Sequence, residues 1–244
     1  LAYSYVRELH RAFGIESTIV LATQNIKMLS ESRFTDYRLE PHIHEQEGLY
    51  NALERIAKMF DGAHPEKTLL ILGCDDCHAR MLSQGKQRLQ DLGYVVPYID
   101  FPLLDDITQK RRFYEICEEL DIPFPKTWYF DCGNGPDELP VSEFPYPLIA
   151  KPSNSAQFQD AEPSIEGWRK IYEIESPEEL RSLAQHPYAD YNNLLVLQDF
   201  IPGGDDAIRT LTTFSDASGD LRVVAGGVVC LQDHDPTALG NPLC

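Results

Sequence analysis

The chain has 244 residues, of which 43% are hydrophobic and 25% are charged, and 39 acidic side chains face only 21 lysines and arginines. This composition is typical of a globular protein with a buried core, and the length allows two modest domains. The formal net charge of −18 argues against a nucleic-acid partner, because the acidic side chains would repel phosphate. If such a chain binds a phosphorylated ligand, it must gather its few basic residues locally.

The sequence carries no targeting or membrane signal that we recognise. No apolar run approaches the ~20 residues that a membrane-spanning helix requires, so no membrane span is predicted. The first residues have neither the basic nor the apolar segment of a secretion signal. The six cysteines mostly have apolar neighbours, which predicts reduced, buried thiols. We therefore expect a cytoplasmic protein; its oligomeric state stays open, and a homodimer is one option.

The first 107 residues alternate between helical and extended patterns. Their extended runs are continuously apolar, which is typical of a parallel sheet covered by helices on its faces. We predict a Rossmann-like, parallel-sheet α/β domain over residues 1–107. A helix that passes directly into a strand, as at Gly14, usually follows another strand, so we expect one before it. The predicted elements are helices 3–13, 48–60 and 79–92 and strands 17–21, 68–72 and 94–96.

Residues 108–244 differ from the first part in composition and in their pattern of predicted elements. Prolines at 123 and 125 keep the chain extended and mark a join between domains. Beyond them, glycine, proline, asparagine and aspartate crowd residues 131–147. We predict an α+β domain with a mainly antiparallel sheet, incomplete at its far end. The predicted elements are helices 108–120 and 177–185 and strands 146–151, 170–174, 194–199, 209–214 and 221–231.

Lys151 ends an apolar strand and is followed by Pro-Ser-Asn-Ser and a long polar stretch. An ammonium group at a strand end can offset the charge of nucleotide phosphates. A loop rich in serine and asparagine can close over phosphates with its hydroxyl and N–H groups, which makes Ser153 and Ser155 candidates. Lys170, placed at the start of the next predicted strand, could reach the same phosphates. The alternative is a surface loop with two solvated lysines.

A second segment, Gln198-Asp-Phe-Ile-Pro-Gly-Gly-Asp-Asp-Ala-Ile-Arg209, follows the apolar run 194–197. The backbone of Asp199 and Ile201 could face an adenine edge. Asp205 or Asp206 could accept hydrogen bonds from a ribose, and Arg209 could meet a phosphate or a carboxylate bidentately. The alternative is a hairpin turn with ordinary surface charges.

The two segments, in this order and behind a β-α-β domain, resemble the ATP-grasp superfamily, and within it the carboxylate–amine ligases of the D-aspartate ligase type. The resemblance covers nearly the whole chain. It implies a parallel-sheet pre-ATP-grasp domain (1–107) followed by an incomplete α+β ATP-grasp domain (108–244). Further motifs share that family's order: Leu72-Gly-Cys-Asp-Asp76, Lys110…Phe113-Tyr114, Pro123-Phe-Pro-Lys-Thr127 and His234-Asp-Pro…Gly240-Asn-Pro.

The resemblance also implies roles for residues. Lys151 and Lys170 would contact the α- and β-phosphates of ATP, with Lys110 approaching the nucleotide from the linking helix. Arg209 would lie near the γ-phosphate or an acyl phosphate, which makes Arg209 and Lys151 the catalytic candidates. The adenine frame would consist of Gln198, Asp199, Phe200 and Ile201.

This chain departs from the family pattern at two points. The family usually has glutamate where Asp199 stands and one glycine where Gly203-Gly204 stand, so the ribose contact is left to Asp205 or Asp206. The ligands for Mg²⁺ are expected beyond Cys244, so we predict no metal ligand in this chain.

The implied reaction joins a small-molecule carboxylate to an amine acceptor through an acyl phosphate, at the cost of ATP and with Mg²⁺. D-aspartate or a similar amino acid would be the carboxylate, and a peptidoglycan precursor would supply the amine. One alternative is activation of bicarbonate, as in carbamoyl-phosphate synthase and biotin carboxylase. Another is a catalytically silent nucleotide-binding module.

Two further sequence patterns give only weak evidence for a haem or metal site. Cys74-Asp-Asp-Cys-His78 matches a haem-attachment string, but that function requires export, and no second ligand pair follows at zinc spacing. Such a strand end more often lines a ligand crevice, here with Asp75 and Asp76. His42 and His44 lie on one face of an extended segment; exposed loop histidines of this kind are common without a metal.

Overall fold

The computed structural model describes residues 1–60, 68–153, 169–186, 188, 191, 193–233, 242 and 243. The chain divides into two compact units, Leu1–Thr108 and Gln109–Cys244. This division lies one residue from the boundary expected between 107 and 108. Of the helices in the described ranges, none is both long and apolar enough to cross a membrane.

Unit 1 contains two pairs of parallel strands, β1 with β2 and β3 with β4. Parallel pairing agrees with the prediction from the continuously apolar strands. The elements in chain order are α1 (Ala2–Phe13), β1 (Thr18–Ala22), α2 (Lys27–Ser30), β2 (Thr35–Leu39), α3 (Gln46–Phe60), β3 (Leu69–Leu70), α4 (Asp76–Gln84), α5 (Lys86–Asp91), β4 (Tyr94–Val95) and α6 (Phe101–Thr108).

The core of unit 1 forms where one face of α3 meets α4, α5 and β4. Leu49, Leu53 and Ala57 on α3 recur four residues apart and are buried there together with Leu82 and Leu89. An apolar cavity of about 380 Å³ borders this core and is lined by residues of α1, β1, α3 and β3. The expectation that a strand precedes α1 stays a prediction.

The helix predicted over 79–92 is wrong in detail, because the structure has two helices that meet at Gly85. A Cβ atom at this position would lie 2.4 Å from the Tyr50 ring, so the close approach of α3 requires glycine there. The turn lets α4 and α5 both pack on α3. The prediction also missed α2, β2 and α6. Strand β2 (TDYRL) carries charged residues on a partly exposed edge and lacks the apolar run used to recognise strands.

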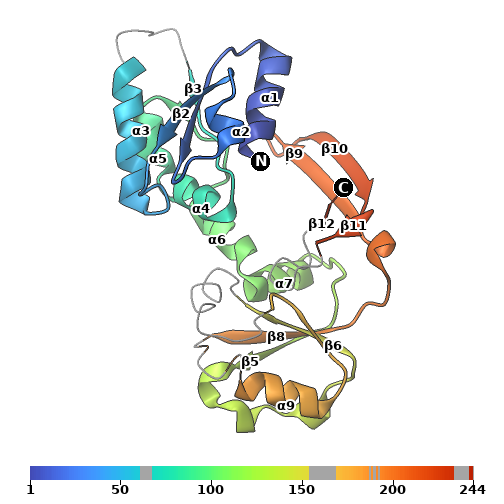
Figure 1. Cartoon of the computed structure of the whole chain (residues 1–244). Helices are drawn as coiled ribbons and strands as arrows, with labels where there is room; N and C mark the ends of the chain where they lie inside the picture. The colour runs from blue at the N-terminus through green and yellow to red at the C-terminus, as the bar shows by residue number, and fades with distance from the viewer. Residues whose placement is uncertain are drawn as a thin grey trace. The chain divides into compact units, whose positions relative to one another are not determined.

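Unit 2 is built on a four-stranded antiparallel sheet with the order β5-β8-β6-β7, as predicted for an α+β region. Figure 1 shows α9 below this sheet and α7 above it. The elements in chain order are α7 (Lys110–Glu119), β5 (Thr127–Asp131), the 3₁₀ turns Cys132–Asn134, Pro136–Glu138 and Val141–Glu143, β6 (Leu148–Pro152), β7 (Tyr172–Ile174), α9 (Pro177–Gln185) and β8 (Leu194–Asp199).

A 3₁₀ turn and a hairpin follow the sheet. Asp205–Ala207 form the turn η5, and β9 (Arg209–Ser215) pairs with β10 (Leu221–Val228) in antiparallel orientation. The single strand predicted over 221–231 is wrong: β10 ends at Val228, and β11 (Leu231–Gln232) pairs separately with β12 (Pro242–Leu243).

The core of unit 2 lies between α9 and one face of the sheet. Leu148 and Ala150 of β6 and Leu195 and Leu197 of β8 are fully buried against this helix. Because side chains alternate along a strand, the residues between them point to the other face, toward α7. The sequence of these strands therefore decides which side chains are available for a site.

Candidate functional site

The sheet face turned toward α7 carries two of the side chains predicted to bind a nucleotide, Lys151 and Gln198. Lys151 lies between the buried Ala150 and Pro152 on β6, so its side chain leaves the core face. Gln198, the penultimate residue of β8, lies on the same face and is opposite Thr127 of β5 in the sheet register. One face of one sheet thus brings together Lys151 and Gln198, which are 47 residues apart in the sequence.

Three lysines converge at the end of β6. Lys110, the first residue of α7, donates from Nζ to the carbonyl of Ser153 over 3.2 Å. Burial, together with the positive charges of Lys151 and Lys170, lowers the pKa of Lys110 from 10.5 to about 8. The folded chain therefore holds this ammonium group where a positive charge is disfavoured. The negative charge of an anion bound among the three lysines would favour the ammonium form of Lys110. It would offset both the cost of burying that charge and its repulsion by Lys151 and Lys170.

Lys151 is half-buried and lies against Tyr114 of α7. Its Nζ is 3.4 Å from the Tyr114 hydroxyl and 5.9 Å from the centre of the ring. A lysine that packs its stem and approaches an aromatic ring is restrained without losing its charge. Tyr114 is thus a site residue to which the sequence argument gave no role, although it stands within one of the motifs that carried the resemblance.

Lys170 belongs to the cluster through its charge, but its predicted position is wrong. It lies in a bend before β7, which begins at Tyr172, and not in the strand itself. A bend position does not fix the side chain to one face of the sheet. Lys170 therefore reaches the neighbourhood of Lys110 from a segment whose direction the sequence pattern did not give.

Ser153 is buried directly after β6, and both its backbone N–H and its hydroxyl form hydrogen bonds. Its N–H donates to the carbonyl of Leu194 over 2.9 Å, and its hydroxyl donates to Asn193 Oδ1 over 3.0 Å. The carbonyl that accepts from Lys110 is therefore fixed to the sheet. Asn193 is a supporting residue that the sequence reasoning missed, and no motif marked it. Ser155, also predicted to contact phosphates, lies outside the described residues.

The strand end at Gln198 is ordered by side chains as well as by the backbone. Gln198 is buried and donates from Nε2 to the Thr127 hydroxyl over 2.7 Å. The prediction that the backbone N–H of Asp199 faces an adenine is wrong in this structure, because it donates to the carbonyl of Lys126 over 3.0 Å. Phe200 follows at the strand end, and Ile201 is 69% exposed. The exposed Ile201 retains an accessible apolar surface.

Asp205 and Asp206 lie in the turn η5, and the structure distinguishes them. Both carboxylate oxygens of Asp205 accept hydrogen bonds from Gln232, one from its N–H and one from its side chain, each over 2.9 Å. The side chain of Asp206 is exposed, while its carbonyl accepts from Arg209. Asp205 therefore ties the turn to β11, and of the two carboxylates Asp206 is the more accessible.

Arg209 opens β9, and its guanidinium bonds to nearby carbonyls. Nη1 donates to the carbonyl of Asp206 over 2.5 Å and to that of Ile208 over 3.1 Å. Both bonds are local, since their acceptors lie three and one residues before Arg209. The structure thus brings Lys110, Lys151, Ser153 and Lys170 together, and it leaves the catalytic role of Arg209 as a prediction.

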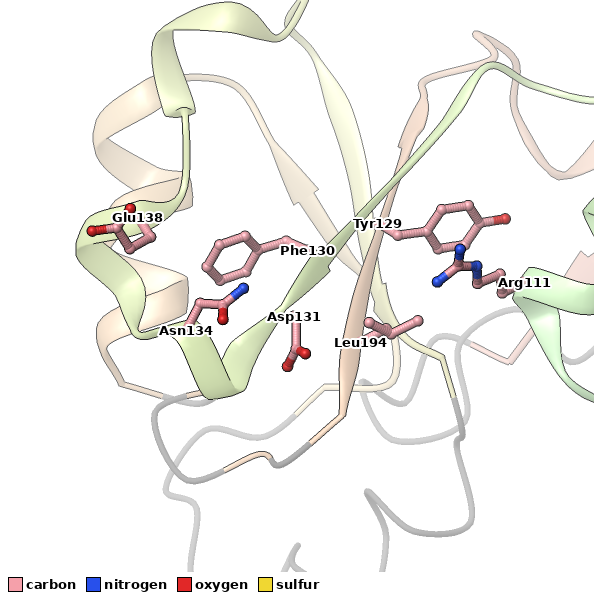
Figure 2. Close-up of a pocket in the computed structure, with 7 residues that line it drawn as sticks. All are labelled: Arg111, Tyr129, Phe130, Asp131, Asn134, Glu138 and Leu194. Atoms are coloured by element: carbon pink, nitrogen blue, oxygen red, sulfur yellow. The ribbon is translucent and has the colours of Figure 1, made fainter.

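A separate open cavity of about 570 Å³ runs along β5 (Figure 2). The Arg111 guanidinium lies 5.6 Å from the centre of the Tyr129 ring at one end of this cavity, and Asp131 is at its middle. No residue predicted from the sequence to bind a nucleotide lines it. Its residues are Arg111, Tyr129, Phe130, Asp131, Asn134, Glu138 and Leu194.

The cysteines agree only partly with the prediction of buried thiols. Of the five in the described ranges, Cys117 is buried and Cys74 and Cys132 are partly buried, but Cys77 and Cys230 are exposed, so the prediction is wrong for these two. Burial raises the pKa of the Cys132 thiol to about 11 and also raises that of Cys74. These two thiols are therefore poor nucleophiles at neutral pH.

Comparison with known proteins identifies a relative with a similar sequence. The chain is 31% identical over 245 residues to the D-aspartate ligase of Enterococcus faecium (strain Aus0004), an alignment that covers 98% of this chain and 56% of the relative. This chain is a homologue of a D-aspartate ligase. The resemblance predicted from the motifs is confirmed. The chain spans about half the length of this relative, and no family model matches it.

Solved structures confirm a mixed α/β fold that resembles ATP-grasp proteins. The L-amino acid ligase from Bacillus licheniformis aligns with a TM-score of 0.60 at 14% identity, over 98% of this chain and 48% of that one. The biotin carboxylase domain of the Hydrogenobacter thermophilus 2-oxoglutarate carboxylase, bound to MgADP, ADP and bicarbonate, aligns with a TM-score of 0.55 at 16% identity, over 90% and 46% of the two chains. At these identities the likeness concerns the fold.

Proposed function

We propose that this D-aspartate ligase homologue is an ATP-dependent ligase that joins a carboxylate to an amine. The observation that carries the proposal is the cluster of Lys110, Lys151 and Lys170 at the end of β6, where burial and like charge disfavour the ammonium group of Lys110. Nucleotide phosphates supply negative charge of the right density for such a cluster. Units 1 and 2 would be the pre-ATP-grasp and ATP-grasp domains.

The reaction proceeds in two displacements. An oxygen of the substrate carboxylate attacks the γ-phosphorus of ATP, the bond to the β-phosphate oxygen breaks, and ADP leaves. The amine then attacks the carbonyl carbon of the acyl phosphate, inorganic phosphate leaves, and the amine gives up a proton as the amide forms. Phosphoryl transfer depends mainly on positioning and on neutralisation of charge.

Residues of this chain would position the nucleotide. Lys110 and Lys151 would hold the phosphates from α7 and β6, with the sheet fixing both positions. Gln198, Phe200 and Ile201 would frame the base, and Asp206, more accessible than Asp205, would meet the ribose. Arg209 would act on the transferred phosphoryl group once a nucleotide is bound.

Magnesium would add charge neutralisation at the phosphates. The described residues contain one group of three candidate metal ligands, and it lies in unit 1 rather than at the lysine cluster. No step is therefore assigned to a magnesium ligand of this chain, and its ligands stay a prediction. The proposed carboxylate is D-aspartate or a similar amino acid, as the homologue's name suggests. The proposed amine acceptor, a peptidoglycan precursor, is implied only by the family resemblance of the sequence.

Release of ADP by the full natural protein tests the proposal. With Mg²⁺ and ATP present, D- and L-amino acids and bicarbonate are supplied one at a time, each with and without an amine acceptor. We expect release that depends on one amino acid. Lys151→Ala should reduce the rate about 100-fold or more, because a charge that stabilises the transition state is lost.

The other outcomes separate the alternatives. Release that depends on bicarbonate alone would support the activity suggested by the biotin carboxylase fold relative and contradict the amide ligase. Tight ATP binding without release for any acid would support a nucleotide-binding module without activity. An unchanged rate in Lys151→Ala would contradict the assignment of the site.

A further inference from the structure

The described part of unit 1 contains a cluster of side chains that the proposed reaction does not use. His44, in the turn after β2, lies next to Asp75 and His78 at the start of α4. One ligand atom from each of the three lies within 4.8 Å of the other two. The imidazole rings of His44 and His78 stack with their centres 5.1 Å apart, and Asp75 Oδ1 is 2.9 Å from His78 Nδ1.

Part of this arrangement has a purely structural explanation. Asp75 is the N-cap of α4 and accepts from the backbone N–H of His78 over 2.7 Å. A cap does not explain His44, which comes from a different segment and is exposed. The observation that adds His44 to the capped helix is the proximity of one of its ring nitrogens to ligand atoms of both Asp75 and His78.

The chemistry of the three side chains is that of a transition-metal site. Two imidazoles and a carboxylate suit Zn²⁺ and its neighbours in the first transition row, whereas Mg²⁺ and Ca²⁺ prefer oxygen ligands. In a tetrahedral zinc site with bonds of about 2.1 Å, ligand atoms are about 3.4 Å apart. The cluster would have to contract by about 1.4 Å at most, and the exposed His44 side chain can move by rotation.

We propose that His44, Asp75 and His78 bind one divalent transition-metal ion of the Zn²⁺ class. Three protein ligands leave one coordination position for water or a small ligand, as in zinc sites that are not closed. His78 and Cys74 also line the apolar cavity of unit 1, so the ion would lie at the edge of that cavity. This proposal is independent of the ligase activity, because none of its residues belongs to the lysine cluster.

Cobalt binding tests the site directly. Metal-free protein is titrated with Co²⁺, without nucleotide, and both the visible d–d absorption and the heat of binding are recorded; Zn²⁺ is then added in competition. We expect one Co²⁺ per chain, displaced by Zn²⁺. His44→Ala should weaken binding at least tenfold, as expected for the loss of one ligand.

The chain offers a matched control in the same turn. His42 is exposed and lies 2.7 Å from Glu45, outside the cluster, so His42→Ala should leave the affinity unchanged. Equal affinities of wild type and His44→Ala would overturn the proposal, and so would an equal loss in both variants. An intense thiolate charge-transfer band that disappears in Cys74→Ser would also overturn it, since the ligands would then be cysteines. Circular dichroism verifies that each variant is folded.

Discussion

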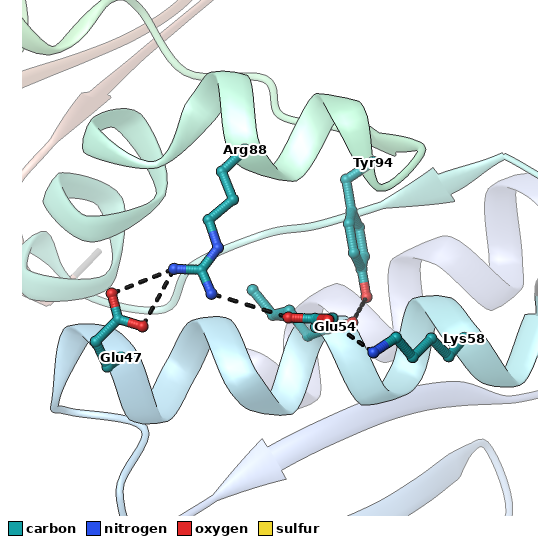
Figure 3. Close-up of polar contacts among 6 residues, drawn as sticks. Glu47, Glu54, Lys58, Arg88 and Tyr94 are labelled. Atoms are coloured by element: carbon teal, nitrogen blue, oxygen red, sulfur yellow. Dashed lines mark hydrogen bonds and ion pairs between the residues drawn. The ribbon is translucent and has the colours of Figure 1, made fainter.

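Two basic residues, one in each unit, have opposite electrostatic surroundings. In unit 1, Arg88 lies between two carboxylates of α3: Nη1 is 3.2 Å from both oxygens of Glu47, and Nη2 is 3.9 Å from Glu54 (Figure 3). In unit 2, Lys110 has its pKa lowered by burial and by two other lysines. A charge set between opposite charges supports the fold, whereas like charges gathered in a partly buried place reduce stability and suit a ligand.

The difference is also one of exposure. The Arg88 side chain is 41% exposed and lies over the ring of Tyr50, so water and salt screen its ion pairs. Lys110 is largely removed from water, where each charge interacts more strongly with its neighbours. Exchanging each residue for methionine, which keeps much of the side-chain volume, should therefore have opposite effects in the two units.

Lys110→Met should give the largest effect. Because folding lowers the pKa of Lys110 from 10.5 to about 8, the folded state binds this proton more weakly than the unfolded state, at a cost near neutral pH of about 3 kcal/mol. The cost falls as the pH rises through 8 toward 10.5. Allowing for the lost hydrogen bond to the Ser153 carbonyl, we expect a gain of about 1–2 kcal/mol in the free energy of unfolding without nucleotide.

The same variant should lose the stabilisation that ADP gives to the wild type, which thermal unfolding with and without ADP measures. Lys58→Met is a suitable control, since Lys58 is exposed on α3 and pairs with Glu54 across one helical turn. This variant should change neither the free energy of unfolding without nucleotide nor the stabilisation by ADP by more than about 0.5 kcal/mol. A Lys110→Met protein that is less stable and still responds fully to ADP would contradict the contrast between the units.

Arg88→Met should give the smaller effect and in the opposite direction. We expect a loss of at most about 1 kcal/mol in the free energy of unfolding, from the weakened contacts to Glu47 and Glu54. Urea unfolding at low and high salt measures it, and the difference from wild type should shrink as salt increases. A loss of several kcal/mol that is independent of salt would show that the Arg88 pairs are not screened surface contacts.

How far the sequence predicted the structure depended on the kind of signal. Strand 194–199 and helix 177–185 were predicted correctly, because an apolar run and a capping serine are local signals. Lys151 was predicted to end its strand, and the structure extends this strand by one residue, to Pro152. Lys110 came from the resemblance, and the sequence could not show that its Nζ meets the Ser153 carbonyl, 43 residues away.

The errors share one cause, which is that tertiary contacts decide local features. The need for glycine at position 85, between α4 and α5, depends on the ring of Tyr50, which lies 35 residues away in the sequence. The N–H of Asp199 is taken by Lys126, a pairing that only the register of β5 on β8 reveals. His44 was interpreted as one of many exposed histidines, because its distance from His78 depends on how the turn after β2 meets α4.

The most direct test of the phosphate-binding role of the lysine cluster is the uptake of protons when ADP binds. Calorimetry at pH 8 in two buffers of different ionisation enthalpy gives the number of protons taken up per ADP bound. Free Lys110 is about half protonated at that pH, and bound phosphate should raise its pKa, so we predict an uptake approaching half a proton in the wild type and none in Lys110→Met. The affinity for ADP should likewise fall as the pH rises above 8. Equal proton uptake in the two proteins, or none in either, would contradict the account.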